Sequence, residues 1–191
     1  MDTIRYLQLQ LANINAIFHD LVEDLRPEEL VTRPGPKQNM MGYTVWHIPR
    51  TQDAHVHTWS RGVPEVAHAE RWRRPPELKR LGYGVGILLE EADEIARSVR
   101  LPDIVDYADE VHHQITLWLK DLDESELDRV PDIPGHLAQH PEYQTSTFLR
   151  EVEHLLDQPI WNQLMRPCIG HVHRHLGELE ITKAVLRTKD G

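Results

Sequence analysis

Apolar residues recur at three- and four-residue steps through long stretches of this chain, and this helical period limits the fold more than any other feature. Residues 2–25 are the clearest case, because a helix over this range gathers its apolar side chains on one face. These side chains are Ile4, Leu7, Leu11, Ile14, Phe18, Leu21 and Leu25. The pattern predicts an amphipathic helix with one face against a core.

The same spacing predicts three further long helices, at about 42–60, 103–122 and 160–187. Pro49 should kink the first of these or displace its start, and Asp103 should begin the second. The sequence shows no alternating strand pattern and no internal repeat. We therefore expect an all-α fold, a four-helix bundle with extra short helices and loop excursions, in a single domain over residues 1–191.

Proline and glycine mark the segments that should be irregular. Residues 61–86 hold four glycines and three prolines, so we expect an irregular excursion over about 61–100, with a short helix at 87–98. The basic run at 71–80 is interpreted as a solvated loop. A second loop, with a brief helical beginning, is expected at 123–145, before a short helix at 146–157.

Composition excludes several classes of protein. The formal net charge of −10 argues against sequence-independent binding to nucleic acid. No apolar run is long enough for a signal peptide or a membrane span, so no membrane partner is expected. The single cysteine, Cys168, can form neither an internal disulfide nor a thiolate cluster, which fits a reducing cytoplasm. Any metal would therefore be held by imidazole and carboxylate groups.

The thirteen histidines are the one compositional excess, and three of them alternate in the stretch CIGHVHRHLGELEIT, residues 168–182. Apolar residues run through this stretch at helical spacing, so His171 and His175 share a face and His173 does not. Two imidazoles one turn apart can bind one ion. A third ligand must come from another helix, and His47, which lies among apolar residues, is the best candidate. Three neutral imidazoles would leave an open position for water or substrate, as in catalytic sites.

Two motifs together resemble the DinB-like superfamily of metal-binding four-helix bundles. They are YTVWHIPRTQDAHV, which contains His47, and GHVHRHLGELEI, which contains His171 and His175. The resemblance spans nearly the whole chain, with 61–100 the least characteristic part. It implies a single DinB-like domain, and it implies that these three histidines bind one divalent ion, with Gly177 and Glu178 completing the C-terminal motif. The superfamily includes mycothiol-dependent maleylpyruvate isomerases and bacillithiol transferases.

Three residues are candidates for catalytic roles beside the metal. Arg50 and Asp53, beyond His47 on the same helix, would orient substrate or a ligand imidazole, although such a pair is also an ordinary helix-surface contact. Glu178 would accept a hydrogen bond from a ligand imidazole or act as a general base, or it is simply solvated. Cys168 is interpreted as a small core residue. The remaining histidines singled out are interpreted as solvated: His55, His57, His112, His113, His136 and His140.

Three functions stay open from the sequence. The first, which the resemblance favours, is a metal-dependent transferase or isomerase that uses a low-molecular-weight thiol on a small-molecule substrate. The second is a metal-dependent hydrolase of small esters or amides. The third is a non-enzymatic helical bundle, with a homodimer that pairs apolar faces as one form of it. Imidazole ligands suit several ions, so we favour zinc or nickel, with iron and manganese as alternatives.

Overall fold

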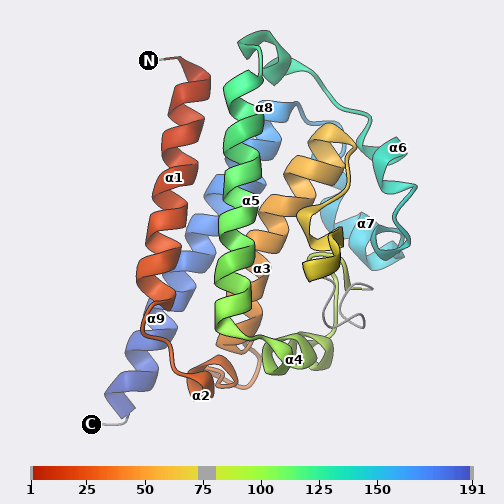
Figure 1. The fold of residues 1–191 in the computed structure, drawn as a ribbon. Helices are drawn as coiled ribbons and strands as arrows, with labels where there is room; N and C mark the ends of the chain where they lie inside the picture. Colours follow the sequence, from red (N-terminus) through yellow and green to blue (C-terminus); the bar gives the residue numbers. More distant parts are fainter. Residues whose placement is uncertain (1, 73–80, 190–191) are drawn as a thin grey trace.

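The computed structural model describes residues 2–72 and 81–189, and over these residues the protein is all-α, with no strand (Figure 1). The long helical segments are α1 (Thr3–Val22), α3 (Met41–Asp53) with its π-helical continuation η1 (Ala54–Arg61), α5 (Leu101–Asp121), and the C-terminal run of α8 (Ile160–Gln163), π-helical η8 (Leu164–His171) and α9 (Val172–Lys189). All four predicted long helices are therefore present.

The predicted stripe of the first helix is confirmed. Helix α1 begins where the Asp2 carboxylate accepts a hydrogen bond from the Arg5 backbone N–H, at 2.6 Å, which satisfies a donor of the first turn. Its buried residues are Leu7, Leu11, Ile14, Phe18 and Val22. Helix α5 starts two residues before the predicted Asp103, with Pro102 in its first turn, where a missing N–H costs no helical hydrogen bond.

Helix α3 runs from Met41 through Pro49 without ending there. Every residue of α3 is buried, so this helix has no solvent face and differs from the amphipathic pattern of α1. Its neighbours explain this: α5 and α9 lie against it, and so does the short helix α4 (Leu89–Ser98). Helix α1 in turn packs against both α5 and α9 and lies on the left of the molecule in Figure 1.

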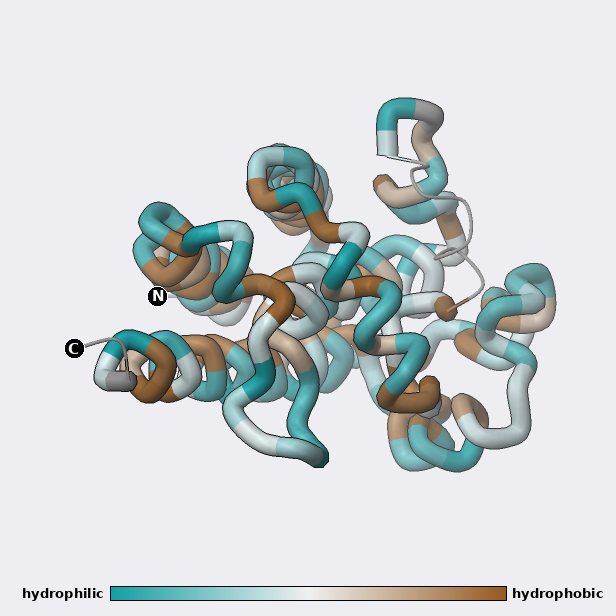
Figure 2. The backbone as a smooth tube through the Cα atoms, turned by 90° about the horizontal axis from the view of Figure 1, so that it is seen from below, coloured by the Kyte–Doolittle hydropathy of each residue, from teal (hydrophilic) through white to brown (hydrophobic). Residues whose placement is uncertain are grey.

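Apolar and polar positions alternate along the turns of the helices when the molecule is viewed from below (Figure 2). The apolar side chains of the long helices meet in one main core, whose members include Leu7, Ile14, Val45, Val111, Ile115, Leu119, Ile160, Leu164 and Val172. Cys168 belongs to this core and is fully buried, as predicted. Within the described residues, no helix is long and apolar enough to cross a membrane.

The predicted excursion contains more regular structure than its glycines and prolines suggest. Its described part holds η2 (Val66–His68), η3 (Glu70–Trp72), a glycine-rich turn over residues 81–86, and α4, which matches the predicted helix at 87–98. In the turn, Gly82 and Gly84 have φ of 56° and 93°, values that side chains disfavour. Most of the basic run at 71–80 falls on residues 73–80 and lies outside the described residues.

Short helices fill the remaining connections. They are α2 (Pro27–Leu30), η5 (Glu124–Asp128), α6 (Ile133–Leu137), η6 (Pro141–Tyr143), α7 (Ser146–Val152) and η7 (Glu153–Leu155). The brief helical beginning of the 123–145 loop is η5, and α7 with η7 confirms the short helix predicted at 146–157. Helix α6 was not predicted, and its Asp132 caps it by accepting from the Gly135 backbone N–H.

Candidate metal centre

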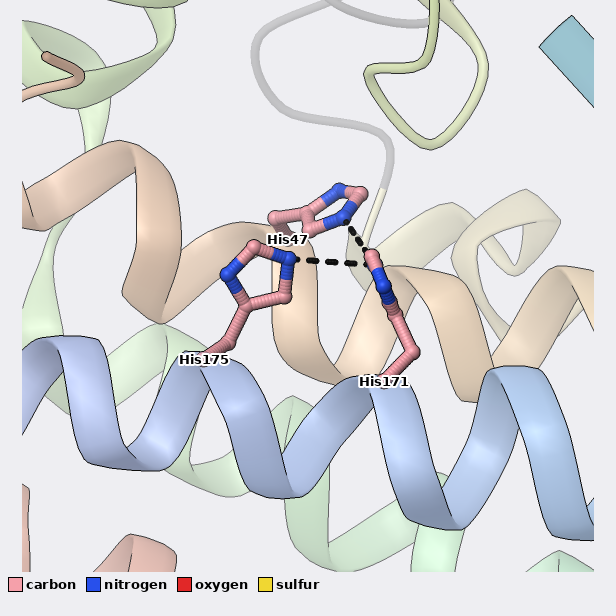
Figure 3. A group of neighbouring side chains, drawn as sticks. All are labelled: His47, His171 and His175. Carbon is pink, nitrogen blue, oxygen red and sulfur yellow. Dashed lines mark hydrogen bonds between the residues drawn. The ribbon is translucent and has the colours of Figure 1, made fainter.

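The structure brings together the three predicted histidines (Figure 3). His47 comes from α3, His171 ends η8, and His175 lies one turn further on in α9. The Nε2 atom of His171 is 3.1 Å from Nε2 of His47 and 3.0 Å from Nε2 of His175. The three rings thus point their Nε2 atoms at one place from two helices that are far apart in sequence.

The Nδ1 atoms of His47 and His175 are held by oxygen acceptors, and this determines where the protons of these two rings lie. His47 Nδ1 is 2.5 Å from the Tyr83 carbonyl oxygen, and His175 Nδ1 is 2.6 Å from Oε2 of Glu178. A carbonyl and a carboxylate only accept, so both Nδ1 atoms carry hydrogen, and in neutral rings both Nε2 atoms are bare.

His171 cannot satisfy both bare nitrogens, because a neutral imidazole donates a single proton. At least one of its two short N···N contacts therefore places two lone pairs face to face. A cation between the rings removes this conflict. Ligand nitrogens at about 2.0–2.1 Å from an ion lie about 2.9–3.4 Å apart, depending on the coordination angle. The observed separations of 3.0 and 3.1 Å lie within that range, so the donor set fits a divalent ion.

Burial keeps these rings in the form that binds metal. Burial, followed by the neighbouring His175 and His171, lowers the pKa of His47 well below its usual value. Burial also lowers the pKa of His171, to about 4. The ring of Tyr43 stacks on His47 at a centroid distance of 5.4 Å, which fixes the plane of the imidazole. At neutral pH both histidines are uncharged and available as ligands.

No protein-family model and no curated protein matches this chain. These comparisons therefore identify no family, and the DinB-like assignment depends on the motifs quoted above.

A cavity of about 700 Å³ opens beside the three histidines. His171 and Thr51 form part of its wall, and Thr51 Oγ1 is 3.3 Å from Nε2 of His47. The rest of the wall combines apolar and charged side chains, among them Val85, Val152, Leu155, Met165, Glu151, Arg166 and Arg174. A small molecule in this cavity would lie against His171, one of the three candidate ligands.

Arg50 and Asp53 lie in a second, fully buried network on the same helix. Arg50 donates to Oδ2 of Asp53 at 3.2 Å, to Oε2 of Glu65 at 2.8 Å and to the hydroxyl of Tyr107 at 3.0 Å. Tyr107 donates to Asp53 at 2.5 Å, and Tyr143 donates to Glu65 at 2.6 Å. Among the described residues, the polar contacts of Arg50 and Asp53 run within this network, to backbone groups and, for Asp53, to the imidazole of His57, and their predicted role toward substrate stays a prediction.

Arg50 is nevertheless connected to the metal site through the backbone. It donates to the Gly82 carbonyl oxygen at 3.1 Å, and the next carbonyl, that of Tyr83, accepts from His47. Tyr83 is the functional residue that the sequence did not reveal. Its backbone oxygen makes the contact, so no side-chain pattern announces it; the only available signal was the GYG triplet at 82–84, which marks a turn.

The interpretation of His55 and His57 as solvated histidines is wrong. Both are buried, at 2% and 3% exposure, because η1 is covered on all sides. His55 contacts Oε1 of Gln163 and the hydroxyl of Tyr83, and His57 contacts the Asp53 carboxylate. These polar partners make their burial tolerable.

The other predicted site residues take up the places that helix geometry suggests. His173 is half-buried and lies outside the group of three, as its position on α9 predicts. The side chain of Glu178 is 52% exposed and binds His175, which matches the predicted acceptor role, while the general-base role stays a prediction. His113 is exposed, as predicted, whereas His112, His136 and His140 are half-buried.

Proposed function

We propose that this chain is a divalent-metal-dependent enzyme of the DinB-like superfamily, with the four-helix bundle of that type. In this proposal the enzyme is a transferase or isomerase that uses a low-molecular-weight thiol on a small-molecule substrate. The observation that carries the proposal is the convergence of the Nε2 atoms of His47, His171 and His175 beside a cavity of about 700 Å³. Three imidazole ligands leave coordination positions free, and zinc or nickel is the favoured ion.

When bound, the ion supplies Lewis acidity, which favours the deprotonated, nucleophilic form of a thiol in an open position. The chain's own residues do the rest. Tyr83 and Glu178 hold two of the imidazoles in the tautomer that leaves Nε2 bare. Arg166 and Arg174 line the cavity and attract an anionic group on the substrate or the thiol.

The thiol has to come from outside the chain. Cys168, the one cysteine, is fully buried in the main core, and burial raises the pKa of its thiol. A protonated and inaccessible thiol is a poor nucleophile. A small thiol that enters the cavity is consequently the source that the geometry favours.

The second candidate is a metal-dependent hydrolase of small esters or amides. Glu151 favours it, because its carboxylate lines the same cavity as His171 and is of the type that serves as a general base for water. A cytoplasmic location and a homodimer belong to the proposal as further expectations, and a non-enzymatic metal-binding bundle is the outcome if no activity accompanies the ion.

The test combines metal analysis with a substrate panel. Purified protein should contain bound metal, and the double variant His171→Ala, His175→Ala should bind one ion fewer per chain. His173→Ala is the matched control, since it removes an imidazole from the same helix on another face, and it should keep the metal. Metal-loaded protein is then incubated with small thiols together with electrophiles, and in a separate assay with small esters and amides.

Formation of a thiol adduct that requires His171 and His175 supports the transferase. Hydrolysis without thiol would favour the second candidate. A protein that takes up no zinc, nickel, iron or manganese, or a double variant that binds as many ions as the unsubstituted protein, would refute the proposed site.

A further inference from the structure

A second group of metal-ligand side chains lies away from the three histidines, where the excursion meets the loop after α6. His68 ends η2, while His140 and Glu142 lie at the start of η6. Their ligand atoms are all within 4.8 Å of one another. The side chains are 17%, 21% and 9% exposed, so the group is largely buried but still accessible to water.

The spacing within this group suits a shared ion better than a shared proton. Oε1 of Glu142 is 3.7 Å from Nε2 of His68 and 3.5 Å from Nδ1 of His140. A hydrogen bond between nitrogen and oxygen is about 2.7–3.2 Å long. Ligand atoms at about 2.0–2.2 Å from a tetrahedral ion are about 3.4 Å apart. Small side-chain movements would bring all three atoms onto one cation.

The negative charge of the surrounding carboxylates also favours a bound cation. Oε2 of Glu65 is 3.8 Å from Nε2 of His68, and Glu65 and Asp53, both fully buried, share the single guanidinium of Arg50. With neutral histidines, the described members Arg50, Asp53 and Glu65 together carry one excess negative charge. The Glu142 carboxylate, which lies 3.7 Å from Nε2 of His68 and 3.5 Å from Nδ1 of His140, adds another.

Protonation of both imidazoles would be a costly way to balance this charge. The rings of His68 and His140 lie nearly parallel, at a centroid distance of 5.6 Å and an angle of 17°. Two imidazolium ions at this distance repel each other. One divalent cation supplies the same charge at a single point and leaves both rings neutral.

We propose that His68, His140 and Glu142 bind a second divalent cation of the zinc type. Two imidazoles and one carboxylate form a known zinc ligand set that leaves a position for water. The bound ion joins η2 to η6 across the outer side of the Arg50 network, where Tyr143 of η6 already binds Glu65. The ion would hold the described part of the excursion against η6. This inference does not depend on the function proposed for His47, His171 and His175.

The test is a zinc titration of the metal-free, full-length chain by calorimetry, with the bound zinc counted by elemental analysis after desalting. Wild type should bind two zinc ions per chain. Glu142→Gln and His140→Ala should each bind one, and so should the double variant His171→Ala, His175→Ala. His112→Ala is the matched control, because it removes a half-buried histidine outside both groups, and it should still bind two.

The variants separate the two sites. If Glu142→Gln binds as much zinc as wild type, or if the double variant of the three-histidine site binds none, the second site does not exist. If only the double variant behaves like wild type, the function proposed above fails while this inference stands. Circular dichroism checks the fold of His140→Ala. If His140→Ala unfolds, the zinc count of Glu142→Gln, which keeps the side-chain volume, tests the second site instead.

Discussion

Replacing Arg50 by methionine tests whether the buried ion network holds the protein together. Methionine keeps most of the side-chain length and removes the charge and the donors. The guanidinium lies in hydrogen-bond reach of the carboxylates of Asp53 and Glu65, both of which are completely buried. Without it, those carboxylates keep hydroxyl and backbone donors but lose their buried guanidinium, although Asp53 still contacts His57.

The expected loss of stability is about 4 kcal/mol at pH 7. Removing one partner of a buried ion pair costs about 3–5 kcal/mol. A separate estimate gives a similar figure. In the variant, one of the two carboxyl groups can become protonated, which removes the uncompensated charge. At pH 7, which is roughly three pH units above an ordinary carboxyl pKa, this protonation costs about 1.4 kcal/mol per pH unit. At pH 5 the same protonation costs about 1 kcal/mol, so the deficit of the variant should shrink as the pH falls.

Urea unfolding of the metal-free protein, followed by circular dichroism, measures this deficit at both pH values. Arg129→Met is the control, since Arg129 forms an i,i+3 ion pair with Glu126 in which both side chains are about half exposed, at 47% and 49%. That change should cost less than about 1 kcal/mol. The reasoning is refuted if the two variants lose equal stability at pH 7, or if the deficit of Arg50→Met does not change with pH.

Three further changes test individual parts of the site. Gly84→Ala should lower the free energy of unfolding in urea by about 1–3 kcal/mol and weaken zinc binding, because φ of Gly84 is 93° and the new Cβ would lie 2.6 Å from the Tyr43 hydroxyl oxygen. Gly177→Ala is the control and should raise the free energy of unfolding by up to about 1 kcal/mol, because its new Cβ would meet no described atom within 4 Å. Equal effects of the two changes would contradict this reasoning. Glu178→Gln should weaken zinc affinity by about 10–100-fold in calorimetry, and unchanged affinity would deny Glu178 its role in orienting the imidazole. Burial lowers the pKa of His55 from 6.5 to about 3, so the unfolded chain binds this proton first and the folded state loses stability as the pH falls from 6.5 toward 3. His55→Gln should therefore reduce the decrease of the urea midpoint between pH 7 and pH 4.5. An unchanged decrease would contradict this role of His55.

The sequence predicted the long helices and the three-histidine group because both depend on local periodicity. The i,i+4 relation of His171 and His175 follows from the helix alone, and the apolar neighbours of His47 indicated that this one side chain faces the core. The environment of 42–60 could not be predicted in the same way. A single apolar stripe implied a solvent face, but α4, α5, α9 and the excursion cover α3 and η1 on every side, so His55 and His57 are buried against partners that only the tertiary structure supplies.

Helix α3 connects the metal site to the ion network through one turn of the excursion. His47 and Arg50 lie three residues apart, and they bind two consecutive carbonyl groups, those of Tyr83 and Gly82. The Tyr83 carbonyl keeps the proton on Nδ1 of His47, and that proton keeps Nε2 bare for the ion. If Arg50 is lost, the turn is free to move and the preference for this tautomer weakens. Arg50→Met should therefore reduce zinc affinity as well as stability, although the Arg50 side chain binds the turn and not the imidazole. The excursion, which is the least characteristic part of the sequence, thus holds His47, the most deeply buried of the three candidate ligands, in the tautomer that could bind an ion.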